Sequence, residues 1–380
     1  MMALNRVSPD RVETTINRLV DSRIRDLKAY HVPPADGLLK LDAMESPYEL
    51  PQDLKLAWAK RLAKIKVNRY PDPGSQDLKA SLRRVFDIPD TSDLMLGNGS
   101  DELIQIIAML VAQSGRGIMA PIPTFSMYHI IATALGVPFI GVPLKADFAL
   151  DEAPMLAEIR AHQPAVIFLA YPNNPTGNTF DDELMMRILD TAEGLVVVDE
   201  AYFAFCGNSY LGKIAQYPNL LLLRTLSKSG LAGLRLGFLV GHPLWVEQLE
   251  KLRLPYNIGV LTQESALFYL QHHDLLEQQS EQIRIERAAL GDALNEIPGI
   301  RVFPSEANFL LVRMDRCRDG HCSIEMIFND LQQEGVLVRN LHAANTALEN
   351  CLRVTVSTPE ENQTFLRILD TVLSRVNYFD

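Results

Sequence analysis

A lysine between a predicted strand and a run of small residues is the first place in this chain where chemistry is expected. Lys228 follows the apolar run 220–223, and Ser229, Gly230 and Gly233 come shortly after it. Burial in such surroundings lowers the pKa of an ammonium group, because desolvation disfavours the charged form. The neutral amine is a nucleophile, and lysines of this kind form Schiff bases with pyridoxal phosphate. A loop lysine is more often simply solvated, so the neighbouring motifs must decide.

An acid and an amide also stand at the ends of predicted strands. Asp199 closes the apolar run 195–198, and Asn174 lies in a proline-flanked turn after the run 165–170. A carboxylate beside a pyridine nitrogen keeps that nitrogen protonated, so that the ring can accept electrons from a substrate carbon. A turn between prolines is rigid and presents an amide at a fixed place. The alternative to these functional roles is that Asp199 only caps a helix after its strand and that Asn174 is an ordinary turn residue.

A glycine-rich turn at residues 96–104 runs into an apolar-periodic helix. Backbone N–H groups at a helix N-terminus bind phosphate through the helix dipole and their unpaired donors. An ordinary capped helix would show the same residues, with Ser100 as the cap and Asp101 and Glu102 complementing the dipole. The turn by itself therefore leaves a phosphate site and a capped helix equally open.

The elements that must position these residues alternate along the chain. Between about residues 41 and 241, short apolar strands are separated by longer helical patterns, with the clearest strands at 118–121, 138–142, 165–170 and 195–198. Their apolar residues are continuous, as expected for strands that are covered on both faces. This alternation predicts an α/β fold with a mainly parallel, doubly wound sheet. Ligands of such sheets bind at the carboxyl ends of the strands, which is where the polar motifs fall.

The pattern changes after about residue 254. A helical stretch over 263–295 precedes mixed strands and helices, with strands expected at 308–312 and 352–356. At the other end of the chain, apolar spacing over 12–27 predicts one amphipathic helix that starts near Pro9.

The change of pattern predicts two domains. We expect a large domain over residues 41–254, and a smaller α+β domain made of residues 1–40 and 255–380.

Composition narrows the classes of function. Of the 380 residues, 47% are hydrophobic and 22% are charged, as in an ordinary soluble enzyme, and the net charge of −11 argues against a nucleic-acid or anionic-membrane partner. No apolar run is long enough to span a membrane, and no secretory signal is visible at the N-terminus. The four cysteines lack the spacing of a metal site. We therefore expect a cytoplasmic protein with reduced thiols and no bound metal.

The motifs, taken in order, resemble those of fold-type-I pyridoxal-phosphate aminotransferases of class I and II, and particularly the histidinol-phosphate aminotransferase family. The resemblance runs from about Tyr30 to the C-terminus. It rests chiefly on the segments 68–74, 96–104, 171–177, 196–202 and 223–235. It implies pyridoxal 5′-phosphate as cofactor, a seven-stranded sheet flanked by helices in the large domain, and a smaller α+β domain. The implied activity is histidinol-phosphate:2-oxoglutarate aminotransfer in histidine biosynthesis.

The resemblance assigns the reactive part of the cofactor to one group of residues. Lys228 would hold the cofactor and, once freed, would move a proton between the substrate and the cofactor. Asp199 would pair with the pyridine nitrogen, and Phe125 would stack on the ring. Asn174 and Tyr202 would share the cofactor's 3′-oxygen. Lys228, Asp199 and Tyr202 are therefore the expected catalytic residues.

A second group is expected to hold the cofactor's phosphate. Its members are Gly99, Ser100, Asp101, Glu102, Thr225, Ser227, Arg235 and Tyr70. Arg235 would pair bidentately with the phosphate, although it comes seven residues after Lys228, one fewer than is common in the family. Tyr70 would reach the phosphate of the other subunit, so the resemblance implies a homodimer with shared active sites.

The anionic end of the substrate is assigned to the C-terminal part of the chain. Arg353 resembles the family's anchoring arginine, Arg339 gives a second cation, and Tyr30 and Asn174 complete the expected substrate site. The expected substrates are histidinol phosphate, with imidazole-acetol phosphate as its ketone, and glutamate, with 2-oxoglutarate as its ketone. For both arginines the alternative is an ordinary surface position on a strand.

Other functions share much of this pattern. An aromatic amino-acid aminotransferase or a threonine-phosphate decarboxylase would carry most of the same motifs. Some transcription regulators contain a similar domain without enzymatic activity, but they add a DNA-binding domain. The acidic chain has no basic N-terminal segment long enough for that role.

Overall fold

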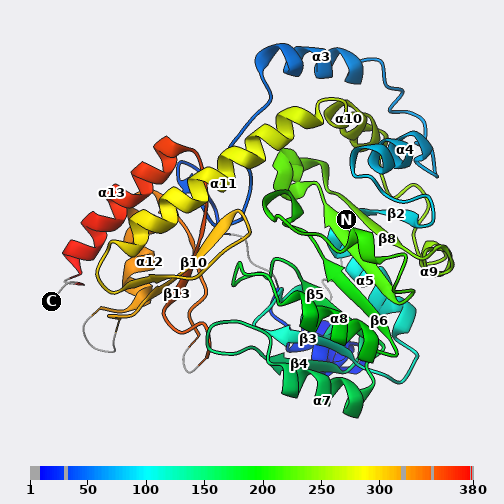
Figure 1. Cartoon of the computed structure of the whole chain (residues 1–380), viewed down its shortest axis with the longest axis horizontal. Helices are drawn as coiled ribbons and strands as arrows, with labels where there is room; N and C mark the ends of the chain where they lie inside the picture. Colours follow the sequence, from blue (N-terminus) through cyan, green and yellow to red (C-terminus); the bar gives the residue numbers. More distant parts are fainter. Residues whose placement is uncertain (1–8, 30–32, 318–321, 344–345, 377, 379–380) are drawn as a thin grey trace, which may run out of the picture.

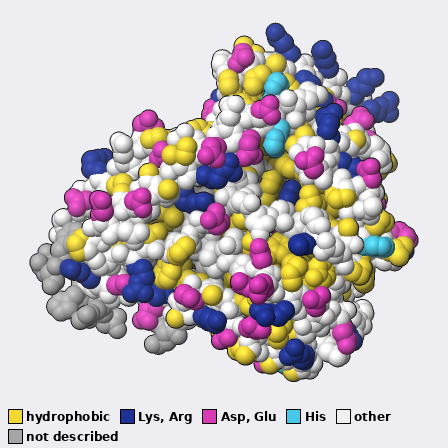
Figure 2. Space-filling view, viewed as in Figure 1, with side chains coloured by type: hydrophobic (Ala, Val, Ile, Leu, Met, Phe, Trp, Pro, Cys, Tyr) yellow, Lys and Arg dark blue, Asp and Glu magenta, His cyan; other side chains and the backbone are white. Residues whose placement is uncertain are grey.

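A computed structural model describes residues 9–29, 33–317, 322–343, 346–376 and 378. The described residues form two parts, one around a seven-stranded sheet and one around a four-stranded sheet, as Figure 1 shows. Acidic and basic side chains are spread over the face of the molecule seen in Figure 2.

The seven-stranded sheet confirms the α/β fold expected from the sequence. In their order across the sheet, the strands are β2 (Asp93–Asn98), β8 (Leu236–Gly241), β7 (Leu220–Thr225), β6 (Leu195–Asp199), β5 (Val166–Ala170), β3 (Ile118–Ile122) and β4 (Phe139–Pro143). Strand β8 is antiparallel to both of its neighbours, and the remaining pairs are parallel. The carboxyl ends of β5, β6 and β7 therefore meet at one edge.

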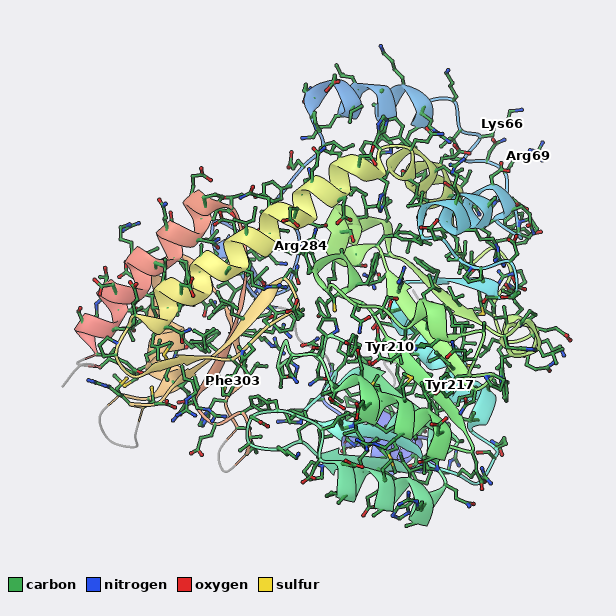
Figure 3. The ribbon with its side chains drawn as sticks, viewed as in Figure 1. Lys66, Arg69, Tyr210, Tyr217, Arg284 and Phe303 are labelled. Carbon is green, nitrogen blue, oxygen red and sulfur yellow. The ribbon has the colours of Figure 1, made fainter. Side chains whose placement is uncertain are left out.

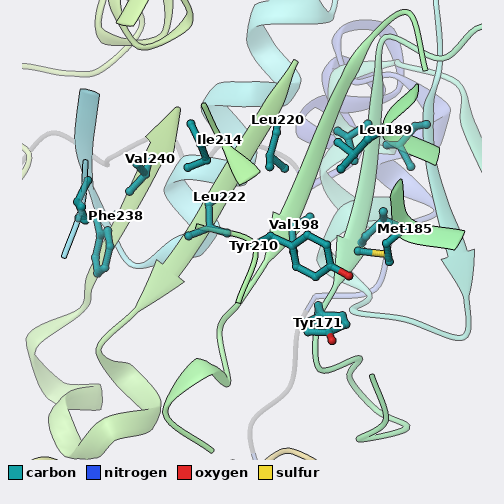
Figure 4. Packing of buried hydrophobic residues seen from close by; sticks show 14 of the residues in the cluster. Tyr171, Met185, Leu189, Val198, Tyr210, Ile214, Leu220, Leu222, Phe238 and Val240 are labelled. Atoms are coloured by element: carbon teal, nitrogen blue, oxygen red, sulfur yellow. The ribbon is translucent and has the colours of Figure 1, made fainter. Parts of the chain in front are cut away.

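Helices cover both faces of this sheet because successive strand residues point to opposite sides. In β5, Val166 and Phe168 pack into one cluster and Ile167 and Leu169 into the other. The helices on the first face are α5 (Ser100–Val111), α6 (Met127–Leu135) and α9 (Pro243–Glu250). The helices on the second face, whose cluster is drawn in Figure 4, are α4 (Gln76–Val85), α7 (Glu152–His162), α8 (Asp182–Thr191) and α10 (Val260–Leu270).

The second part of the molecule is built on an antiparallel sheet. Its strands, in order, are β12 (Arg339–Asn340), β13 (Cys351–Thr355), β10 (Phe309–Met314) and β9 (Ile300–Val302). Its core also takes side chains from α11 (His273–Asn295), α12 (Ile324–Gln333) and α13 (Pro359–Arg375). A short parallel pair, β1 (Leu39–Lys40) with β11 (Val336–Leu337), brings the chain after residue 40 to this part.

Two expected helices are each interrupted. The stretch 263–295 is not one helix but α10 and α11, with a break at residues 271–272. The break lets α10 pack against the core of the seven-stranded sheet while α11 crosses toward the four-stranded sheet (Figure 1). The N-terminal stretch is likewise two helices, α1 (Pro9–Leu19) and α2 (Ser22–Arg25), because Asp21 caps the second by accepting from the Arg23 N–H.

The boundary near residue 254 stays a prediction. Leu270 and Leu276 belong to the core of the seven-stranded sheet, whereas Ile283 belongs to the core of the four-stranded sheet. Leu41 also packs into the second core. We propose that the division between the parts runs through α11 rather than through a linker.

Candidate active site

A cavity of about 100 Å³ lies at the carboxyl ends of β5, β6 and β7. The predicted site residues that line it are Ser100, Asp101, Phe125, Asn174, Asp199, Tyr202, Thr225, Ser227, Lys228 and Arg235. They come from separate segments of the sequence, and the parallel strands bring them to one edge of the sheet. None of the helices in the described chain is long and apolar enough to cross a membrane. Among the residues that the structure describes, no group of three or more His, Cys, Asp or Glu side chains could hold a metal ion.

Lys228 sits just beyond the end of β7 in a wide turn, η3 (Ser227–Leu231). Its Nζ donates to the Ala43 carbonyl oxygen at 3.2 Å and lies 5.9 Å from the centre of the Tyr202 ring. Burial, together with the positive charge of Arg353, lowers the pKa of the Lys228 amine to about 8. An appreciable fraction of the amine is therefore neutral near neutral pH, as a nucleophile requires.

Asp199 ends β6 and is buried. Its carboxylate accepts from the Tyr128 hydroxyl at 2.7 Å and from the Ala201 N–H at 3.1 Å. Burial raises the pKa of Asp199 to about 6, while the hydrogen bond from Tyr128 opposes that rise. The ring of Tyr128 is in the core, and its hydroxyl faces the site.

A buried ion pair braces the strand ends that carry these two groups. Glu200, next to Asp199, accepts from Arg224 Nε at 3.0 Å and from Arg224 Nη2 at 2.9 Å. Arg224 immediately precedes Thr225 at the end of β7, and its guanidinium lies 4.5 Å from the centre of the Phe203 ring. The ion pair links the end of β6, which carries Asp199, to the end of β7, which the turn with Lys228 follows.

The glycine-rich turn and Arg235 together form a candidate anion cradle. Helix α5 starts at Ser100, and its N-cap Gly99 has a positive φ of 82° and no side chain to cap the helix. The positive φ favours glycine here, and a Cβ at Gly99 would lie 2.6 Å from Arg235 Nη2, so the guanidinium would have to move. The unpaired N–H groups at the start of α5 and the guanidinium therefore share one region.

Hydroxyl groups complete the cradle. Thr225 Oγ1 bonds to Ser227 Oγ at 2.9 Å, and Arg235 Nη1 donates to Ser227 Oγ at 3.4 Å. Arg235 also pairs with Asp101 at 3.3 Å. The loop between Lys228 and Arg235, although one residue short, still brings the arginine to the cavity. These donors suit a phosphate group.

Arg353 is not among the residues that line the cavity, but it contacts one of them, Asn174, from the other sheet. From β13, its Nη1 donates to Asn174 Oδ1 at 2.6 Å and its Nη2 donates to the Asp42 carbonyl at 2.9 Å. The contact uses the Asn174 carbonyl as acceptor, so the amide N–H groups of this cavity-lining residue are not the atoms that bind Arg353. Arg339 pairs with Arg353 across strands β12 and β13 and is half-buried.

Some predicted residues lie away from this cavity. Glu102 accepts from the Asn98 N–H at 2.6 Å and from Asn257 Nδ2 at 2.8 Å, so its carboxylate holds neighbouring loops. Tyr70 is 80% exposed and stacks on Tyr256 with ring centres 4.4 Å apart. Gly99 contributes by leaving room for Arg235 rather than by lining the cavity. Tyr30 lies outside the described residues.

Sequence reasoning missed the segment 42–44, which closes the cavity from the side of the four-stranded sheet. Met44 lines the cavity, and its sulfur accepts from the Tyr202 hydroxyl at 3.1 Å. The Met44 carbonyl in turn accepts from Asn308 Nδ2 at 3.0 Å. The segment acts largely through backbone carbonyls, including those of Ala43 and Asp42, so its side-chain types carried no motif.

Comparison with known proteins adds a family to this geometry. The model of the family "Aminotransferase class I and II" matches residues 36–369. Histidinol-phosphate aminotransferase 1 of Ralstonia nicotianae is 49% identical over 360 residues, which are 93% of this chain and 94% of that protein.

Solved structures agree in fold. Histidinol-phosphate aminotransferase from Sinorhizobium meliloti, solved in complex with pyridoxal-5′-phosphate, superposes with a TM-score of 0.81 at 22% identity, covering 99% of this chain and 100% of that chain. L-threonine-O-3-phosphate decarboxylase from Porphyromonas gingivalis superposes with a TM-score of 0.75 at 21% identity, covering 88% and 99%. At these identities the structures establish the fold alone.

Proposed function

We propose that this chain, which belongs to the class I and II aminotransferases and within them to the histidinol-phosphate aminotransferase family, moves an amino group between histidinol phosphate and 2-oxoglutarate. Pyridoxal 5′-phosphate is the proposed cofactor. The observation that carries the proposal is one cavity that combines Lys228, Asp199 and Asn174 with an anion cradle.

The residues present fit this cofactor part by part. The space that Gly99 leaves beside Arg235, and the donors around it, suit the phosphate. The buried Asp199 carboxylate suits a protonated ring nitrogen, since a cation is the partner that compensates a buried anion. Phe125 lines the same cavity, where an aromatic ring can be stacked. When bound, the cofactor supplies an electron sink for the substrate carbon that loses its proton.

The chain's own residues then do three things. Lys228 Nζ, with its lowered pKa, is the amine that attaches the cofactor and the base that takes and returns the substrate proton. The negative charge of Asp199 would favour a protonated ring nitrogen when the cofactor is bound. Tyr202 and the amide of Asn174, which line the cavity, would help to hold the cofactor's ring. Lys228, Asp199 and Tyr202 are thus the proposed catalytic residues.

Arg353 and Arg339 are the proposed readers of the substrate's anionic end. Their strands are paired in register, so the two cations enter from neighbouring positions of one sheet. A phosphate with up to two negative charges gains more from two arginines than a carboxylate does, because each charge-assisted hydrogen bond to an ion contributes roughly 1.5–3 kcal/mol. Tyr30 remains a predicted contributor to this side.

We further propose a homodimer in which Tyr70 serves the partner's site. Tyr70 lies on the surface of this chain, and Val67 and Leu254 are also exposed apolar side chains. The preceding segment carries the exposed cations Lys66 and Arg69, which lie at the edge of the molecule in Figure 3. An apolar and basic edge of this kind suits a contact beside another chain's phosphate site. The cytoplasmic location stays a prediction.

A substrate panel tests the function. Purified protein loaded with pyridoxal phosphate is assayed with histidinol phosphate, phenylalanine and threonine phosphate, following glutamate formed from 2-oxoglutarate and, separately, carbon dioxide. We expect histidinol phosphate to give the highest kcat/KM. Preferred use of phenylalanine would identify an aromatic aminotransferase, and carbon dioxide release from threonine phosphate would identify a decarboxylase.

Mixed dimers test the assembly. Lys228→Ala and Tyr70→Ala chains, each inactive alone, are mixed under conditions in which chain exchange is shown by mass. One site of the mixed dimer then has both an intact lysine and an intact partner tyrosine, so part of the activity should return. No recovery after proven exchange contradicts a role for Tyr70 across the interface.

A further inference from the structure

Tyr128 connects the acid of the site to the core of the seven-stranded sheet. It lies in α6, is 1% exposed, and donates its hydroxyl to Asp199 Oδ2 at 2.7 Å. We propose that Tyr128 is a positioning residue that fixes the Asp199 carboxylate and keeps it ionised opposite the cofactor's ring nitrogen. This inference rests on the proposed function, and it assigns to Tyr128 an indirect role that acts through Asp199.

The aromatic surroundings hold the hydroxyl in place. The Tyr128 ring stacks on Phe168 with centres 4.6 Å apart and planes at 8°, and Phe125 meets it edge-on at 5.6 Å. A ring held on two sides cannot swing its hydroxyl away without disturbing the core. Burial and the charge of Asp199 raise the pKa of Tyr128 well above its ordinary value, so the hydroxyl remains a donor. The bond therefore always favours the carboxylate form.

The other groups around Asp199 explain why this donor matters. Asp101 from α5 and the adjacent Glu200 add negative charge, which together with burial disfavours a further carboxylate. Both are partly neutralised, Asp101 by Arg235 and Glu200 by Arg224.

Lys228, Arg235 and Tyr202 share the cavity with Asp199, and the remaining donor to the carboxylate among the described residues is the Ala201 N–H. Without the Tyr128 hydroxyl, the Ala201 N–H would be the remaining described donor that opposes the rise in the Asp199 pKa caused by burial.

The chain contains a matched control. Tyr210 is also buried, and its hydroxyl donates to Asp182 at 2.6 Å, outside the cavity that Asp199 lines. Figure 4 shows Tyr210 beside Tyr171 in the opposite core cluster, and Figure 3 labels its place in the whole molecule. Tyr210→Phe also removes one hydroxyl-to-carboxylate bond, in this case a partly buried bond to an exposed aspartate, and it leaves Asp199 untouched.

The first measurement is the pH dependence of kcat/KM and of the equilibrium binding of pyridoxal phosphate. Asp199 acts as an anion, and removal of a donor to that anion raises its pKa. In Tyr128→Phe the acid limb of both profiles should move to higher pH by about one unit, with recovery on the alkaline side. Tyr210→Phe should leave both limbs in place. Equal shifts in the two variants, or no shift in Tyr128→Phe, would overturn the proposal.

A second measurement uses the cofactor-free protein, so that it does not depend on the proposed activity. Asp199 binds its proton more tightly in the folded state, so stability should fall as pH rises from about 4 to about 6. In Tyr128→Phe this fall should extend to higher pH, as read from Tm against pH. Once Asp199→Asn is also present, the Tyr128→Phe change should no longer alter the shape of the profile. A change of shape that survives in the Asp199→Asn background contradicts action through Asp199.

The two measurements separate the possible failures. If the wild type transfers no amino group to any substrate of the panel, the proposed function fails, yet the Tm profiles still report on the bond to Asp199. If the wild type is active and the profiles of Tyr128→Phe and wild type coincide, the positioning role alone fails.

Discussion

The residues that line the cavity and the arginine that contacts them from the other sheet are positioned in different ways. On one side, Asp199, Asn174 and Lys228 follow the ends of adjacent parallel strands, and Asp199 is paired in register with Ala170 and Leu223. On the other side, Arg353 comes from a sheet with its own core and is fixed by its bonds to Asn174 and the Asp42 carbonyl. Strand register places Asp199, Asn174 and Lys228, whereas contacts between the two parts place Arg353, the proposed reader of the substrate's anionic end.

The electrostatics of the strand-end side add a second contrast. Burial lowers the pKa of Lys228 to about 8 and raises the pKa of Asp199 to about 6. Desolvation is the largest cause in both cases, because it disfavours a charge of either sign. The same enclosure thus makes a neutral amine available and makes the acid depend on its hydrogen bonds. Variants on the strand-end side should therefore abolish chemistry, and variants on the Arg353 side should change selectivity.

The largest effect is expected at Lys228. Lys228→Ala removes both the amine that attaches the cofactor and the base that moves the proton, so kcat should fall by about 10⁴-fold or more. The cofactor should still bind, because the cradle and Asp199 are intact. Borohydride treatment of the wild type followed by peptide mapping should label Lys228. A label on another lysine would contradict the assignment.

The next effect is expected at Asp199. Asp199→Asn keeps the shape of the side chain and removes its charge, so kcat should fall by about a thousandfold and cofactor affinity should weaken. Steady-state kinetics and equilibrium dialysis of the cofactor measure the two changes. A near wild-type rate would show that the acid only caps the chain after β6.

A smaller and selective effect is expected at Arg353. Arg353→Ala should lower kcat/KM for histidinol phosphate by at least about a hundredfold, equivalent to about 2.7 kcal/mol, through loss of the phosphate contact. Histidinol without the phosphate should lose less, although some loss is expected because Arg353 also holds Asn174. Arg339→Ala, on the neighbouring strand, is the matched comparison and should cost less. Equal losses for both substrates would show that Arg353 does not read the phosphate.

The smallest effect concerns pH. In the proposed function the neutral form of Lys228 attaches the cofactor, and burial lowers the pKa of this amine to about 8. The rate at which the cofactor-free protein captures pyridoxal phosphate should therefore rise about tenfold per unit well below pH 8 and level off above it. Stopped-flow absorbance measures the rate. A rate that is flat between pH 6 and 8 would contradict a lowered pKa.

Much of the strand-end side followed from the sequence. Uninterrupted apolar runs predicted strands covered on both faces, and the rule that ligands bind at their carboxyl ends placed Asp199, Asn174 and Lys228 together. These inferences succeeded because each site residue lies within a few positions of a strand whose pattern is local. The seven-stranded sheet and the cavity confirm that arrangement.

The tertiary structure decided what no local pattern encodes. The carbonyls of segment 42–44, the contact of Arg353 with Asn174 and the bond of Tyr128 to Asp199 join residues far apart in the chain. The break between α10 and α11 arises in the same way, because each helix packs on a different core. The sequence by itself determined which side chains end the strands and hence the kind of chemistry. Packing within and between the two parts decided the hydrogen-bond partners, since backbone carbonyls and long-range contacts leave no periodic signal in the residue types.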